Sequence, residues 1–170
     1  LVLESDVPWV PATTRLRDDC YVVHAGHDPL FLRYPVRGFR CDAALTTGAD
    51  RLLEANAAAG RPTYGYVFTW PSPANGGALG ACHSLDVFFV SGTHVLVPGF
   101  AGSGPTADQL STTMMDAWVA FATTGDPSTP SLPWPRFETG QRTLMVLGAQ
   151  CHPTTNYREP ERRVWDGVIP

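Results

Sequence analysis

One histidine stands in a sequence context that suits acid–base chemistry. His83 ends the glycine-rich stretch GGALGACH, which follows an apolar stretch ending at Trp70. In open α/β sheets, reacting groups gather on loops beyond the carboxyl ends of strands. A histidine there can act near neutral pH as a general base and then as a general acid, and Gly80 and Ala81 leave room for its ring to reach a nucleophile. The alternative is a histidine that only caps the following turn.

A second group of residues has the donor types of a metal site. Cys20, His24, His27 and Asp28 form a C-x3-H-x2-H-D cluster, and thiolates, imidazoles and carboxylates are all zinc ligands. No second pair of ligands follows at the spacing of a zinc finger, which favours ordinary loop residues. We therefore expect no metal at these residues.

The cysteine pattern indicates reduced thiols rather than a disulfide framework. The four cysteines include no C-x-x-C pair, and they stand at Cys20, Cys41, Cys82 and Cys151. A chain of 170 residues does not need disulfides to hold its core. Reduced thiols favour a reducing compartment such as the cytoplasm, although the compartment itself stays open.

The elements before and after His83 follow from local signals. Asp50 is a candidate N-cap for a helix that Gly60 and Pro62 would end. Thr63–Trp70 is rich in aromatic and β-branched residues, which predicts a strand covered on both faces. A loop should then lead to His83.

The most regular helix is predicted to open at Thr106 and to close at Gly125, before the Asp126–Pro127 pair. An apolar stripe at helical spacing supports it: Leu110, Met114, Ala117, Trp118 and Phe121. A short strand is expected at Arg142–Leu147 and a terminal helical turn at Glu159–Trp165. This order of elements suggests the closing part of an α/β sheet.

Residues 1–50 are poorly patterned, and no period of 2 or 3.6 persists there. We expect an extended stretch at Val7–Arg15, a short strand at Asp18–Val23 and a loop at His24–Pro35. The chain starts at Leu1 without the basic and apolar regions of a signal peptide, so we expect a fragment. We divide it into residues 1–50 and residues 51–170, the second carrying the His83 loop.

Composition excludes some classes of function. The net charge is −4, all twelve basic residues are Arg, and no basic run exceeds the pair Arg162–Arg163, which argues against a nucleic-acid partner. No apolar run approaches the roughly 20 residues of a membrane span. The hydrophobic fraction of 44% indicates a globular core.

From about Arg51 onward the sequence resembles the type B carboxylesterases, in particular the bacterial para-nitrobenzyl-esterase branch of the cholinesterase-like α/β hydrolases. Five segments carry the resemblance in family order: RLLEANAAAGRPTYGYVFTWPSP, GGALGACHSLDVFFV, LSTTMMDAWVAFATTGDPSTPSLPWPRF, RTLMVLG and ERRVWDGVIP. The resemblance implies that His83 is the histidine of a Ser-His-Asp/Glu triad. It places Asp86 where the family usually has Glu.

The sequence also departs from the family pattern. No G-x-S-x-G motif, the strained turn that carries the family's nucleophile, occurs in the chain. The segment VPWVPATTRLRDD resembles the one before the family's triad acid, so Asp19, or Asp18, is a candidate acid; an exposed loop carboxylate is the alternative. His83 follows Asp19 by only 64 positions, a shorter interval than in the family, and a deletion or shifted reading frame in residues 20–50 would explain this.

We therefore expect the C-terminal part of an α/β-hydrolase fold, an incomplete domain that supplies His83 to carboxylic ester hydrolysis. Its substrate would be a small ester, and its partner the missing N-terminal half of the same enzyme. The resemblance implies that no metal or organic cofactor is needed. Aromatic side chains near the loop are candidates for a substrate pocket or for core packing: Trp70, Phe88, Phe89 and Phe100. The alternative is an inactive remnant with a structural or assembly role, which would expose a large apolar face.

Overall fold

The computed structural model describes the backbone of residues 2–3, 22–25, 38–41 and 43–163, and side chains from residue 49 to residue 163 except residue 161. The candidate acids Asp18 and Asp19 lie outside the described residues. So do Cys20, His27 and Asp28 of the cluster considered for a metal. The chain divides into two compact units, residues 1–50 with 158–170 and residues 51–157. Each is described by itself.

The first unit contains a small parallel sheet of three strands, β1 (Val2–Leu3), β2 (Val22–Ala25) and β3 (Gly38–Cys41), in the order β1-β2-β3. The strand expected at Asp18–Val23 corresponds to β2, which begins four residues later. The helical turn expected near the C-terminus is α5 (Glu159–Arg163). An ion pair between Arg163 and Glu159, one turn apart, supports it.

The second unit is built on a mixed sheet with the order β4-β5-β6. The strands are β4 (Tyr66–Phe68), β5 (Leu144–Leu147) and β6 (His152–Thr154). β4 runs parallel to β5 with Tyr66 opposite Met145, and β6 runs antiparallel to β5. All four residues of β5 are buried, which matches its central place.

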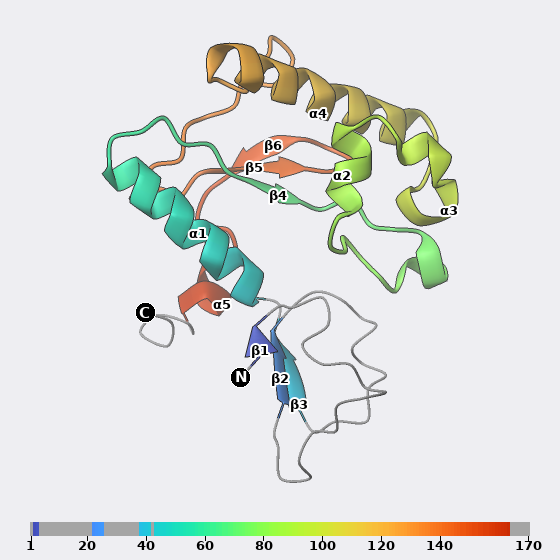
Figure 1. The fold of residues 1–170 in the computed structure, drawn as a ribbon, viewed down its shortest axis with the longest axis horizontal. Coiled ribbons are helices and arrows are strands. Elements are labelled where there is room, and N and C mark those ends of the chain that lie inside the picture. The colour runs from blue at the N-terminus through green and yellow to red at the C-terminus, as the bar shows by residue number, and fades with distance from the viewer. Residues whose placement is uncertain (1, 4–21, 26–37, 42, 164–170) are drawn as a thin grey trace. The chain divides into compact units, whose positions relative to one another are not determined.

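The strand expected at Thr63–Trp70 is only partly correct. β4 pairs over three residues, and Tyr66 is 39% exposed, so the strand is not covered on both faces along its length. On one face Tyr66 contacts Trp118 of α4, and Phe68 contacts Phe89 of α2. The side chain of Leu53 on α1 lies beside Gly65 and Leu144. Figure 1 shows α4 on one side of this sheet and α1 on the other.

Helix α1 (Ala43–Ala58) begins seven residues before the expected N-cap. Asp50 lies inside the helix and is 5% exposed, so it does not cap it. The reason is the sequence AALTTGA before Asp50, whose alanines let the helix continue toward the N-terminus. The C-terminus agrees with expectation: Gly60 has φ +71°, and the Gly60 and Arg61 amides donate to the carbonyls of Ala57 and Asn56.

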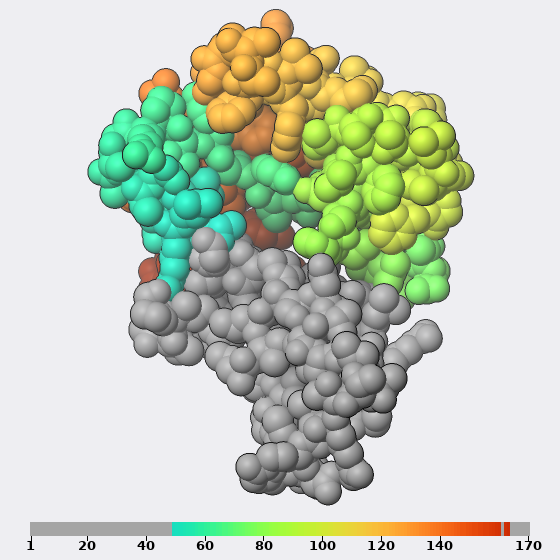
Figure 2. All heavy atoms as spheres, viewed as in Figure 1, coloured from blue at the N-terminus to red at the C-terminus, as the bar shows by residue number. Residues whose placement is uncertain are grey.

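Helix α4 (Pro105–Thr124) agrees closely with the prediction. It ends at Gly125, whose φ of +78° is left-handed and whose amide donates to the Phe121 carbonyl. The first three residues of the apolar stripe are buried, Trp118 is half-buried, and Phe121 is 49% exposed. In Figure 2 α4, coloured from yellow to orange, lies along the top of this unit. Within the described part of the chain, no helix combines the length and apolar character that a membrane span requires.

Four short helical segments complete the second unit: η2 (Ala74–Gly77), α2 (Leu85–Val90), η3 (His94–Leu96) and α3 (Pro98–Ala101). The core joins α2 and α3 to α4 and β5. Its fully or nearly fully buried members are Leu85, Phe89, Ala101, Ala107, Leu110, Met114, Ala117, Leu132, Trp134, Met145 and Leu147.

Candidate active site

The structure places His83 at the surface, between a long loop and helix α2. The loop starts after β4 and ends at Cys82, and α2 begins two residues after His83. His83 is exposed. Ser84 has a left-handed backbone, with φ +62° and ψ +2°. Among the described residues, no side chain forms a hydrogen bond or an ion pair with the imidazole, so the ring is accessible to another reacting group.

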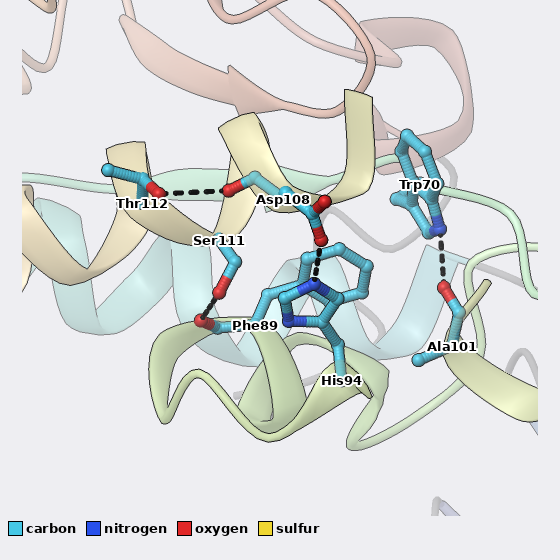
Figure 3. Close-up of polar contacts among 7 residues, drawn as sticks. All are labelled: Trp70, Phe89, His94, Ala101, Asp108, Ser111 and Thr112. Atoms are coloured by element: carbon cyan, nitrogen blue, oxygen red, sulfur yellow. Dashed lines mark hydrogen bonds and ion pairs between the residues drawn. The ribbon is translucent and has the colours of Figure 1, made fainter. Parts of the chain in front are cut away.

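The loop that leads to His83 is fastened at its base. The amide of Ser72 donates to the Gly80 carbonyl over 2.8 Å, which closes the loop. The Ser72 hydroxyl donates to the Phe100 carbonyl. The indole Nε1 of Trp70 donates to the Ala101 carbonyl over 2.8 Å, as Figure 3 shows. Two of these bonds tie the start of the loop to α3, and the third joins Gly80, near the end of the loop, to that start. The glycine-rich loop is therefore restrained at its base.

Helix α2 continues directly from His83 and is anchored in the core. The amides of Leu85 and Val87 donate to the carbonyls of Cys82 and Ser84, so the turn containing His83 leads into the helix without a break. Leu85 and Phe89 are both fully buried. The position of His83 therefore depends on how α2 packs.

Asp86 is held by a tyrosine from the sheet. The Tyr66 hydroxyl donates to Asp86 Oδ2 over 2.8 Å. Burial, followed by this hydrogen bond and by the charge of Asp86, raises the pKa of the Tyr66 phenol above its ordinary range. Tyr66 therefore stays a proton donor to Asp86 at neutral pH. Sequence reasoning noted the position of Asp86 but not this partner, because the two residues are 20 positions apart.

The aromatic residues near the loop serve the core. Phe89 is fully buried and packs against Phe68 and Trp70, with ring centroids 5.5 and 5.6 Å apart. Phe88 and Phe100 contact each other edge to face at 5.9 Å. Trp70, Phe88 and Phe100 are partly buried against the same core. This supports core packing, one of the two roles expected from the sequence.

Several serines are unsuited to nucleophilic attack because their hydroxyls are engaged. Ser72 and Ser111 are buried and donate to the carbonyls of Phe100 and Phe89. Ser91 donates to the Val87 carbonyl. Ser84 and Ser103 are exposed, but neither stands in a G-x-S-x-G motif.

The structure contains a buried histidine to which sequence reasoning assigned no role. His94 is 4% exposed, and its Nε2 lies 2.9 Å from Asp108 Oδ1 on α4. The imidazole stacks on the Phe89 ring, with centroids 5.1 Å apart and 13° between the planes. Asp108 falls in the first turn of the helix predicted from Thr106, but no local signal in the sequence pairs it with His94.

A cavity of about 450 Å³ lies away from His83. It is bordered by the start of α4 and by the loops around Leu132 and Cys151, and its lining is uncharged. Cys151 is half-buried, with its Sγ 3.8 Å from the Gly148 carbonyl. Among the side chains that the structure describes, no group of three or more His, Cys, Asp or Glu could hold a metal ion.

Comparisons with known proteins give a consistent result. A family model described as "Carboxylesterase family" matches residues 13–165. Phenmedipham hydrolase of Pseudarthrobacter oxydans is 34% identical over 97 residues, which are 52% of this chain and 19% of that protein. Para-nitrobenzyl esterase of Bacillus subtilis is 33% identical over 104 residues, or 60% of this chain and 21% of that protein.

Solved structures show the same likeness. An esterase from Clostridium hathewayi, described as able to hydrolyse aliphatic aromatic polyesters, aligns with a TM-score of 0.67 at 25% identity, over 76% of this chain and 26% of that one. A Geobacillus stearothermophilus carboxylesterase aligns with a TM-score of 0.58 at 31% identity, over 71% and 25%. This chain thus spans between 19% and 26% of the length of these four proteins, and its fold is part of an α/β-hydrolase domain.

Proposed function

Because the chain belongs to the carboxylesterase family, we propose that it takes part in the hydrolysis of carboxylic esters, with His83 as the general base and general acid. In this reaction His83 removes the proton of a serine hydroxyl as the serine attacks the ester carbonyl. The resulting imidazolium then donates that proton to the leaving alcohol. In the second half of the cycle His83 activates water, which releases the acid and restores the serine.

The position and exposure of His83 are the observations that carry the proposal. The residue is exposed at the end of the loop that follows a strand of the sheet. None of the described side chains forms a hydrogen bond or an ion pair with its imidazole. The base of the loop is fastened by Trp70 and Ser72. A ring that moves protons must be both reachable and held, and this arrangement supports both requirements.

The proposal places the other two members of the triad, the serine nucleophile and the acid, in different parts of the enzyme. The nucleophile is assigned to a part of the enzyme beyond this sequence, because the chain has no G-x-S-x-G motif and three of its serines are engaged with carbonyls. Asp19 is proposed as the acid that orients the imidazole. The substrate class is a small carboxylic ester, in keeping with the name of the para-nitrobenzyl esterase to which the chain is similar.

Hydrolysis of para-nitrophenyl butyrate by the purified chain, with and without His83→Ala, tests the assignment of the nucleophile. We expect no turnover above the uncatalysed rate in either protein. Turnover that His83→Ala abolishes would support the histidine but show that the nucleophile lies within this chain. Equal turnover in both proteins would contradict the role of His83.

A further inference from the structure

The half-buried pair His94–Asp108 lies next to helix α2, which begins two residues after the candidate histidine. Asp108 is in the first turn of α4, and its side chain is 60% exposed, whereas the His94 side chain is 5% exposed. Figure 3 shows Asp108 and Ser111 reaching from α4 toward His94 and Phe89. The pair therefore joins α4 to the segment that follows α2.

Phe89, which belongs to α2, is the residue through which His94 and α4 contact that helix. Its ring stacks on His94, and its carbonyl accepts a hydrogen bond from the Ser111 hydroxyl over 2.7 Å. The same residue contacts Phe68 and Trp70, which flank the start of the loop that leads to His83. Phe89 is thus fixed from α4, from the sheet and from His94 at once.

The hydrogen-bonding of His94 is one-sided. Its Nδ1 is buried and has no hydrogen-bond partner, while Nε2 faces Asp108. An Nε2–H tautomer satisfies the only strong donor of the neutral ring, because the proton then points at a carboxylate acceptor. Hydrogen bonds to an ionised acceptor are stronger than neutral ones, so this contact can fix the ring against Phe89.

From these contacts we propose that His94 and Asp108 are positioning residues for His83. They hold the C-terminal end of α2 against α4, and α2 holds the turn that contains His83. Neither residue touches the substrate. The role of the positioned histidine rests on the proposed function, whereas the positioning itself is a property of the fold.

The experiment uses the 170-residue chain and two readouts by NMR: the Cε1–Hε1 cross-peak of each histidine and the exchange rates of the α2 amides. Asp108→Ala removes the acceptor, and His94→Phe keeps the stacking ring but removes the hydrogen bond. Asp108→Asn keeps an acceptor oxygen while removing the charge. Asp116→Ala, an exposed carboxylate on the same helix, is the matched control.

We expect Asp108→Ala and His94→Phe to move or split the His83 cross-peak and to accelerate exchange in Leu85–Val90 about tenfold. The amides of β5 should keep their protection. Asp108→Asn should change both readouts less than Asp108→Ala, because it keeps an acceptor oxygen and loses only the charge. An effect of charge at the end of α4 alone would be equal in these two variants. Asp116→Ala should change neither readout.

The proposal is overturned if the His83 cross-peak and α2 exchange stay unchanged in Asp108→Ala while the His94 cross-peak moves, because the bond is then broken without consequence. It is also overturned if β5 loses protection together with α2 in both variants, since the pair would then stabilise the whole unit. Neither readout depends on catalysis, so a failure of the proposed function would leave this test intact.

Discussion

At the scale of single residues, the pair Tyr66–Asp86 shows how the fold changes the chemistry of a side chain. Tyr66 comes from the sheet and Asp86 from the first turn of α2. The tyrosine ring also lies edge-on to Trp118 and Trp134, at 5.3 and 6.5 Å. Partial burial and the neighbouring carboxylate therefore both favour the protonated phenol.

This contact predicts a particular pH dependence of stability. The pKa of Tyr66 is raised in the folded state, so the folded state binds the phenol proton more tightly than the unfolded chain. That contribution is complete below the unfolded pKa of roughly 10 and is lost as the pH rises above it. We expect Tyr66→Phe to flatten the fall in stability between pH 9 and pH 12, measured by urea unfolding.

Tyr64→Phe provides the matched control, because it removes a half-buried phenol two residues away and leaves the contact with Asp86 in place. The steeper alkaline fall should persist in that variant. If Tyr66→Phe loses stability with rising pH as steeply as the parent chain, folding does not raise the pKa of the Tyr66 phenol.

At the scale of elements, the sequence-based predictions are most accurate where the signals lie within or next to the element itself. Helix α4 was predicted within one residue at each end, because its apolar period and Gly125 lie within the helix or next to it. The strand at Thr63–Trp70 was too long, because pairing with β5 ends at Phe68 and depends on residues almost 80 positions away. The position of His83 after β4 could be predicted, but its neighbours across the fold could not.

The C-terminus of α4 offers a test of one such local signal. A Cβ added at Gly125 would meet no atom within 4 Å, but the residue has φ +78°. Gly125→Ala should therefore destabilise the chain by about 1 kcal/mol through backbone strain alone, as measured by urea unfolding.

Gly140→Ala is the companion variant, since Gly140 has equally open surroundings and no positive φ. We expect its stability to stay within about 0.5 kcal/mol of the parent. Equal losses in the two variants would show that the left-handed conformation of Gly125 is not what ends the helix.

At the scale of the whole molecule, the second unit packs around one apolar core, and His83 lies at the surface of that unit. Its core draws on α2, α3, α4 and β5, and the ion pair between Arg142 and Glu54 links the approach to β5 with α1. Large apolar side chains nevertheless remain exposed on several elements: Leu52, Val87, Val95, Leu96, Val119 and Phe121. The family match covers residues 13–165 and so includes residues of both units.

The central claim, that His83 moves protons in ester hydrolysis, is tested most directly in a complete enzyme. We would replace the aligned segment of Bacillus subtilis para-nitrobenzyl esterase with residues 51–157 of this chain and measure kcat for para-nitrophenyl butyrate. His83→Ala in this chimera should lower kcat by at least about 10³-fold, because the serine loses its base. His152→Ala, which removes an exposed histidine in β6, should change kcat by less than about twofold. A folded chimera without turnover, or one in which His83→Ala retains kcat within tenfold of its parent, would contradict the claim.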